Sequence, residues 1–96
     1  MPFAIVLAPE AVEDLERLKA AVRSTVKDAM ETHLRHAPEK TSRSRIKRLR
    51  GISRPQYRLR VSDIRVFYDV AEGVVEVLAI VPKSETAAWL AQFGKL

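Results

Sequence analysis

Three arginines on two neighbouring predicted strands are the residues of this chain best suited to bind an anion. They are Arg58, Arg60 and Arg65, and apolar residues alternate with them. We expect Ser62 and Asp63 to form a two-residue hairpin loop. Arg60 then lies directly opposite Arg65, and Arg58 shares their face because side chains alternate along a strand. Opposed like charges repel, so this face predicts a site for a phosphate, such as a polynucleotide backbone.

Two alternatives concern the same three arginines. Acids of the same chain could neutralise them, because Asp69 lies on the predicted face of Arg65 and Glu76 or the chain terminus could also reach it. A register shift of one residue would instead move the arginines to different faces of the sheet. Sequence alone leaves both alternatives open.

The charge of the chain is strongly polarised. Lys and Arg number 17 and Asp and Glu 12, which gives a formal net charge of +5. The segment from Arg35 to Arg65 holds 11 basic and two acidic residues, a net charge of +9. A patch of one sign attracts polyanions, and nine of the 11 basic residues are Arg, which pairs with phosphates in a fork geometry. A solvated basic face that only confers solubility is the alternative.

Length and composition exclude several classes of function. With 96 residues, we expect one domain that spans residues 1–96. Cysteine is absent, which rules out disulfides, zinc–cysteine sites and thiol chemistry. We expect no metal site, because His33 and His36 have no nearby third ligand and fit an exposed helix end better. The longest apolar run is too short to cross a membrane and the N-terminus does not resemble a signal peptide, so we expect a cytoplasmic protein.

The first half of the chain predicts a strand followed by two helices. Residues 2–7 form an apolar run, and apolar residues then recur every three or four positions from residue 9 to residue 36. One helix of that length would measure ~40 Å, whereas a globule of this size is only ~30 Å across. We therefore expect a break between Lys19 and Arg23, which makes a helical hairpin that Pro38 ends.

The second half predicts three strands and a short helix. Residues 39–54 are expected to form a basic connector without a strand, in which Gly51 adopts a positive φ. Strands follow at 56–61, 64–70 and 74–81, with a turn at residues 72–73. A helix over 84–93 begins with Ser84 as its cap. The predicted fold is α+β, in which an antiparallel three-stranded meander joins the first strand in one sheet.

Several motifs occur in a recognisable order. Leu49-Arg50-Gly51 comes first, Tyr-Arg-Leu-Arg-Val follows at residues 57–61, and Arg-Val-Phe-Tyr at residues 65–68. Val-Pro-Lys-Ser-Glu closes the series at residues 81–85. Over nearly the whole chain this order resembles the RelE/ParE superfamily, the toxins of type II toxin–antitoxin systems, and in particular its RelE-like branch.

The resemblance implies a ribosome-dependent endoribonuclease, or mRNA interferase. Such toxins enter the ribosomal A site and cut the messenger when a ribose 2′-hydroxyl attacks the adjacent phosphate, without a metal or another cofactor. It also implies a cognate antitoxin, a small acidic RelB-like protein that forms a hetero-oligomer with the toxin. Exposed sheet edges could accept a strand of that partner.

The resemblance also implies roles for individual residues. Arg58 and Arg60 match paired basic residues of one strand of the family, and Arg65 matches a basic residue of the next strand. Ser84 falls where many members have a catalytic Arg, with Lys83 beside it as a substitute cation. These five residues are the expected catalytic group. Arginine stays protonated and is a poor general base, so the general base remains unassigned.

Other residues are expected to contact RNA or the ribosome. Trp89 lies near the position of a base-stacking tyrosine of the family, although a lone Trp on a terminal helix is more often a core anchor. The basic side chains of the connector would contact ribosomal RNA, namely Arg43, Arg45, Lys47, Arg48, Arg50 and Arg54. A ParE-like inhibitor of DNA gyrase and an RNA- or ribosome-binding module without catalysis are the alternative functions.

Overall fold

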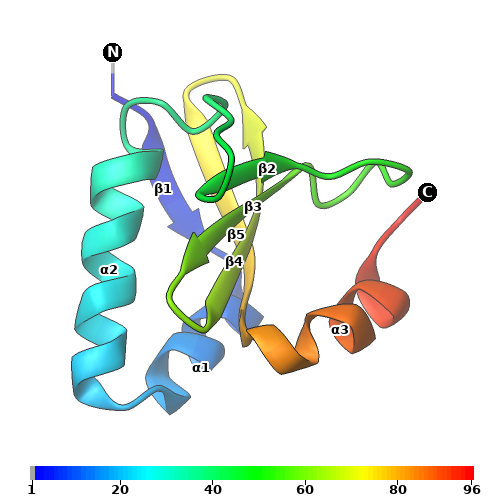
Figure 1. Ribbon diagram of the computed structural model, residues 1–96. Helices are drawn as coiled ribbons and strands as arrows, with labels where there is room; N and C mark the ends of the chain where they lie inside the picture. Colours follow the sequence, from blue (N-terminus) through cyan, green and yellow to red (C-terminus); the bar gives the residue numbers. More distant parts are fainter. Residues whose placement is uncertain (1) are drawn as a thin grey trace.

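The computed structural model describes residues 2–96, which form five strands and three helices (Figure 1). A short 3₁₀ turn, η1 (Lys83–Glu85), comes directly before the last helix. The strands are β1 (Ala4–Leu7), β2 (Ile46–Arg48), β3 (Tyr57–Val61), β4 (Ile64–Ala71) and β5 (Val74–Pro82). The helices are α1 (Pro9–Arg17), α2 (Ala20–Leu34) and α3 (Thr86–Phe93).

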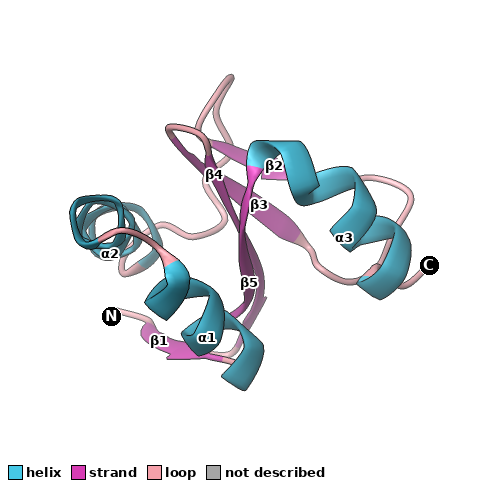
Figure 2. Ribbon diagram, turned by 90° about the horizontal axis from the view of Figure 1, so that it is seen from below, coloured by secondary structure: helices cyan, strands magenta, loops and turns pink. Residues whose placement is uncertain are grey.

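All five strands belong to one sheet, in the order β1-β5-β4-β3-β2. β1 runs parallel to β5, and every other neighbouring pair is antiparallel. Figure 2 shows α1 and α2 on one side of the sheet and α3 on the other. The predicted α+β architecture is confirmed, with the meander and the first strand in one sheet.

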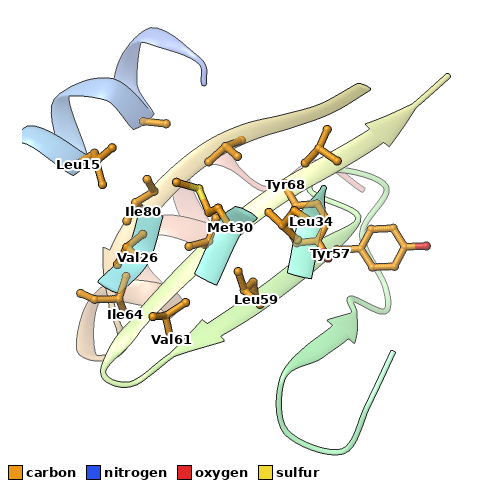
Figure 3. Close-up of a cluster of buried hydrophobic side chains, with 14 of the residues drawn as sticks. Leu15, Val26, Met30, Leu34, Tyr57, Leu59, Val61, Ile64, Tyr68 and Ile80 are labelled. Carbon is orange, nitrogen blue, oxygen red and sulfur yellow. The ribbon is translucent and has the colours of Figure 1, made fainter. Parts of the chain in front are cut away.

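The main hydrophobic core lies between the sheet and the pair α1 and α2. Leu15 from α1 and Val26, Met30 and Leu34 from α2 meet apolar side chains of β3, β4 and β5 (Figure 3). A smaller cluster on the other face packs under α3. The sheet therefore has two apolar faces of unequal size, and the smaller one borders the predicted arginine site.

The helical hairpin breaks at Leu18 and Lys19. Both residues have extended backbone angles, with ψ of 149° and 148°. The prediction of a break near Lys19 is confirmed, and so is its reason, because the molecule measures 32 × 31 × 27 Å. One continuous helix would have projected beyond the globule.

The predicted connector contains a strand that sequence analysis missed. β2 consists of Ile46, Lys47 and Arg48. They pair with Leu59, Arg58 and Tyr57 of β3, in that order. Only Ile46 is buried there, while Lys47 and Arg48 are exposed. Three residues with two cations show no alternating pattern, and charged side chains are common on edge strands. The expectation of a strandless connector is therefore wrong at this point.

The β3–β4 hairpin has the predicted register. Val61 pairs with Ile64, Arg60 with Arg65, and the remaining pairs follow in step. Ser62 has a φ of 52°, which is unusual for a residue with a side chain. The predicted positive φ of Gly51 is confirmed at 78°. The alternative of a register shift is thereby excluded.

Candidate functional site

The three arginines share the face of the sheet that α3 partly covers. Arg60 lies opposite Arg65, and Arg58 pairs with Phe67 on β4 and with Lys47 on β2. Lys47 therefore extends the cationic row to the edge of the sheet. Lys47 is one of the predicted ribosome-binding residues, but its place beside Arg58 cannot be predicted from sequence because the short strand β2 carries no periodic pattern.

Burial differs sharply among the three arginines. Arg60 is exposed and Arg58 is half-buried, whereas only 7% of the Arg65 surface is exposed. Arg65 Nη1 donates to the carbonyl oxygens of Ser62 at 2.7 Å and Ile64 at 3.0 Å. Arg65 thus holds the hairpin loop in place as well as contributing charge to the face.

Arg58 is the least compensated of these cations. Its Nε atom is buried without a hydrogen-bond partner within residues 2–96. Desolvation, and after it the charges of Arg65 and Arg60, lower the pKa of Arg58 below its usual range. A buried polar group without a partner is costly, so an anion bound at this face would relieve both the missing hydrogen bond and the repulsion.

The nearby acids are engaged elsewhere. Arg54 Nε lies 2.9 Å from Asp69 Oδ2, and Arg54 Nη2 lies 2.9 Å from Glu76 Oε1. The backbone N–H of Gln56 also donates to Asp69 Oδ1, at 2.7 Å. The carbonyl oxygen of Leu96 accepts a hydrogen bond from Ser53. Asp69 and Glu76 therefore pair with Arg54 and do not neutralise the arginine face, so that alternative is wrong.

The segment after β5 approaches the hairpin loop. The backbone N–H of Lys83 donates to the carbonyl oxygen of Asp63 at 2.7 Å. Ser84 lies in η1 with an exposed side chain, and α3 begins only at Thr86, so the prediction that Ser84 caps this helix is wrong. Lys83 is exposed beside the end of the arginine face.

Trp89 fastens α3 to the sheet. Its ring stacks on Phe67, with centroids 4.9 Å apart and planes 5° from parallel, and Phe93 lies 5.5 Å away on the same helix. Leu90 of α3 packs against the same cluster of Phe67, Ala79 and Val81. Trp89 is thus a core anchor, because its ring packs against Phe67 inside the protein.

Comparison with known proteins identifies the family. A family model described as ParE toxin of type II toxin–antitoxin system, parDE, matches residues 5–87. The chain belongs to this toxin family, within the RelE/ParE superfamily. It is the toxin of a type II toxin–antitoxin system. No curated protein sequence gives a significant match.

Solved structures share the fold of this toxin. A chain of the toxin–antitoxin complex RelBE2 from Mycobacterium tuberculosis is 19% identical with a TM-score of 0.74, over 85% of this chain and 99% of that chain. The E. coli toxin RelE, as a mutant in the free state, is 21% identical with a TM-score of 0.70, over 93% and 92%. A chain of the RelE–RelB complex from Pyrococcus horikoshii is 23% identical with a TM-score of 0.70, over 86% and 97%.

The connector cations that are expected to contact RNA gather around the β2 edge. Arg43, Arg45 and Arg50 are exposed, and the Arg48 guanidinium lies 5.1 Å from the centre of the Tyr57 ring. Arg45 also approaches the hairpin, because its carbonyl oxygen accepts the N–H of Arg60 at 2.8 Å. The edge strand thus brings the connector cations and the strand arginines onto one end of the molecule.

His33 of the toxin lies near the end of α2, close to Arg45 of the connector. Among residues 2–96, no three His, Asp or Glu residues gather in a group that could hold a metal ion. Desolvation, with a smaller effect of Arg45, lowers the pKa of His33. No helix within the described range has the length and apolarity needed to cross a membrane.

Proposed function

We propose that this toxin is a ribosome-dependent endoribonuclease that cuts mRNA in the ribosomal A site. The observation that carries the proposal is the arginine face, where Arg58 has a buried Nε without an acceptor beside Arg60 and Arg65. A cation that forms no ion pair within residues 2–96 is suited to an anionic substrate. The structural similarity to the toxin RelE supports the same branch of the superfamily.

The proposed reaction is attack of a ribose 2′-hydroxyl on the adjacent phosphate. The oxygen–phosphorus bond to the next nucleotide breaks, and the products are a 2′,3′-cyclic phosphate and a 5′-hydroxyl. Negative charge on the equatorial phosphate oxygens grows in the transition state, and fixed cations stabilise it. Arg58 and Arg65 are placed to bind those oxygens, and Arg60 to orient the strand. Because arginine is a poor general base, we assign these three residues to charge stabilisation and positioning and not to proton transfer.

We assign the substitute cation to Lys83. The family position at Ser84 carries a hydroxyl, which supplies no charge, whereas Lys83 is exposed and is linked through its backbone to the hairpin loop. An ammonium group can also donate a proton to the leaving 5′-oxygen. Base stacking by Trp89 stays a prediction. It would require the ring to separate from Phe67.

The proposed partner is a small acidic antitoxin. Several solved relatives are complexes of RelE with RelB. The net charge of +9 between Arg35 and Arg65 would attract an acidic segment. The edge strands β1 and β2 each have one neighbour in the sheet, so either can accept a strand of the partner. Ribosome and messenger are the proposed targets of the free toxin.

The test is induced expression in a bacterial host, with primer extension on an abundant translated messenger and on an untranslated control. The variants are Arg60→Ala, Arg65→Lys and Lys83→Ala. Arg60 is exposed, so its loss should leave the fold intact, and Lys at position 65 keeps a charge in the loop. Lys27→Ala is the matched control, because it removes a cation from the exposed side of α2.

We expect growth arrest and cuts at codon-spaced positions in the translated messenger only. Arg60→Ala should weaken cutting by up to about 100-fold, because Arg60 orients the strand and a reacting group misplaced by ~1 Å can lose that much rate. Lys27→Ala should cut like wild type. Arrest without cuts would reject the nuclease. Equal cutting of the untranslated control would reject dependence on the ribosome.

A ParE-like gyrase inhibitor is the second candidate function. The observations that favour it are the ParE description of the matching family model and Ser84 in place of the catalytic Arg. Accumulation of relaxed or broken DNA with purified gyrase, together with intact messenger, would select it. Neither effect, without growth arrest, would favour a ribosome- or RNA-binding module that lacks catalysis.

A further inference from the structure

A small polar pocket lies between the connector and the β3–β4 hairpin. It has a volume of about 230 Å³ and is lined by Ser44, Arg45, Arg60 and Ser62. The hydrogen bond from the Arg60 N–H to the Arg45 carbonyl oxygen joins its two walls. On the connector side, the Ser42 hydroxyl accepts the N–H groups of Arg45 at 3.0 Å and Ile46 at 3.3 Å, which fixes this wall.

The pocket has the chemistry of a phosphate site. Two arginines and two serines line it, and no acidic residue does. Within residues 2–96, neither Arg45 nor Arg60 forms an ion pair. In the same range, the hydroxyls of Ser44 and Ser62 form no hydrogen bond with the protein, whereas those of Thr25, Ser42, Ser53 and Thr86 do. The donors of all four lining side chains are thus free for one ligand, and phosphate oxygens match guanidinium donors.

Ser62 provides an independent indication. Its φ of 52° lies in the left-handed region, where Gly, Asn and Asp dominate in hairpin loops. Strained backbone at a residue with a side chain points to a use for that side chain. Arg65 holds the Ser62 carbonyl oxygen at 2.7 Å, so the strained loop is kept in one conformation with the hydroxyl beside the pocket.

The position of Arg60 relates the pocket to the arginine face. Arg60 lines the pocket and lies directly opposite Arg65 across the ladder. Neighbouring strands are ~4.8 Å apart, so the backbones of Arg60 and Arg65 lie side by side. A nucleic-acid strand bound at the arginine face could therefore reach the pocket through Arg60.

We propose that the pocket of Ser44, Arg45, Arg60 and Ser62 binds the phosphodiester next to the scissile one, and so sets the position of a single RNA strand on the toxin. The assignment of the scissile phosphate to Arg58 and Arg65 rests on the proposed function. The pocket itself is a phosphodiester site whether or not the toxin cleaves RNA. Because it reads the backbone and not the bases, it contributes affinity and position without sequence preference.

The test measures binding of 2′-deoxy oligonucleotides to the free toxin by NMR titration, without ribosomes. One probe has a single phosphodiester and the other has two. We compare Arg45→Ala, Ser62→Gly and Arg43→Ala. Ser62→Gly removes the hydroxymethyl group without straining the loop, because Gly accepts the positive φ. Arg43→Ala removes the same charge from the same loop without changing the pocket, and it corrects for the loss of net charge.

In wild type and Arg43→Ala we expect the second phosphodiester to tighten binding about fivefold or more, and in Arg45→Ala and Ser62→Gly less than about twofold. Equal losses in Arg45→Ala and Arg43→Ala would overturn the proposal, because net charge alone would then explain the binding. An unchanged gain from the second phosphodiester in Arg45→Ala and Ser62→Gly would also overturn it. Since the probes cannot be cleaved, failure of the nuclease test leaves this outcome unaffected.

Discussion

The guanidinium of Arg65 donates to the carbonyl oxygen of Ser62 at 2.7 Å, and this contact makes one residue serve both the fold and the site. The same Nη1 atom also bonds the carbonyl oxygen of Ile64. The loop of the β3–β4 hairpin therefore depends on a residue whose charge faces the proposed substrate. Loss of activity in an Arg65 variant has two possible physical causes, and a stability measurement separates them.

We expect Arg65→Ala to lower the free energy of unfolding by about 2 kcal/mol, because hydrogen bonds from a charged group to buried carbonyls are lost. For a chain of this length the melting temperature should fall by roughly 10 °C. Arg65→Lys should recover part of the stability and little of the cleavage. Thermal unfolding followed by circular dichroism measures the first, and primer extension the second. Unchanged melting of Arg65→Ala would contradict the loop-fixing role.

Arg58→Met should separate stability from function. Methionine removes a half-buried cation whose Nε has no acceptor, and with it the repulsion from Arg60 and Arg65. Replacing a poorly compensated buried charge by an apolar group of similar size is often neutral or stabilising. We therefore expect an equal or higher melting temperature together with loss of cleavage.

The same variant tests anion binding at the arginine face. Millimolar phosphate should raise the melting temperature of the wild type, because a ligand that binds only the folded state stabilises it. The increase should be smaller in Arg58→Met. A melting temperature several degrees below wild type in Arg58→Met, without phosphate, would show that Arg58 has a structural partner and would reject this account of the face.

Trp89 tests the attachment of α3. Trp89→Ala should cost about 2 kcal/mol, less than for a fully buried Trp because the side chain is only half-buried, and hydrogen exchange should accelerate in the backbone amides of α3. Trp89→Phe should retain most of the stability, since an aromatic ring can still stack on Phe67. Cleavage that follows stability across both variants supports the anchor role. Cleavage lost in a stable Trp89→Phe would instead favour base stacking.

The arginine face could be predicted from sequence because it depends on local rules. Alternation along the strands and a two-residue loop determine which residues face each other, so the opposition of Arg60 and Arg65 follows from a few neighbouring residues. The burial of Arg58 depends on the tertiary structure, in which α3 from the far end of the chain packs on the same face of the sheet. The capture of Asp69 and Glu76 by Arg54 joins residues 15 and 22 positions apart, for which sequence carries no spacing signal.

Two other features, the strand β2 and the start of α3, could not be predicted from the sequence for different physical reasons. β2 is a three-residue edge strand with two exposed cations, and hydrophobic periodicity cannot detect so short a segment. The 3₁₀ turn before α3 displaces the helix start by two residues, so that Ser84 lies within the turn and not at the cap. Helix ends are determined by such local geometry more than by residue preference.

Tyr68 predicts the behaviour of the toxin at high pH. Its hydroxyl donates to the carbonyl oxygen of Pro38 at 2.6 Å within the core. Burial first, and then the neighbouring Tyr57 and Glu39, raise the pKa of Tyr68 above its ordinary value of 10.0. The unfolded chain ionises Tyr68 at a lower pH than the folded protein does. The stability that the neutral phenol contributes is therefore fully present below about pH 10 and is lost as the pH rises above that value.

Urea unfolding between pH 8 and pH 11 measures this dependence. We expect the free energy of unfolding to fall above about pH 10 in wild type, and to fall less steeply in Tyr68→Phe, which cannot ionise. At pH 8, Tyr68→Phe should be less stable by about 1 to 2 kcal/mol, because the Pro38 carbonyl oxygen is left buried without its donor. Tyr57→Phe serves as the matched control, because it removes the hydroxyl of the ring stacked on Tyr68 and leaves the Tyr68 hydroxyl in place. Parallel pH profiles of wild type and Tyr68→Phe would show that the Tyr68 hydroxyl does not control alkaline unfolding.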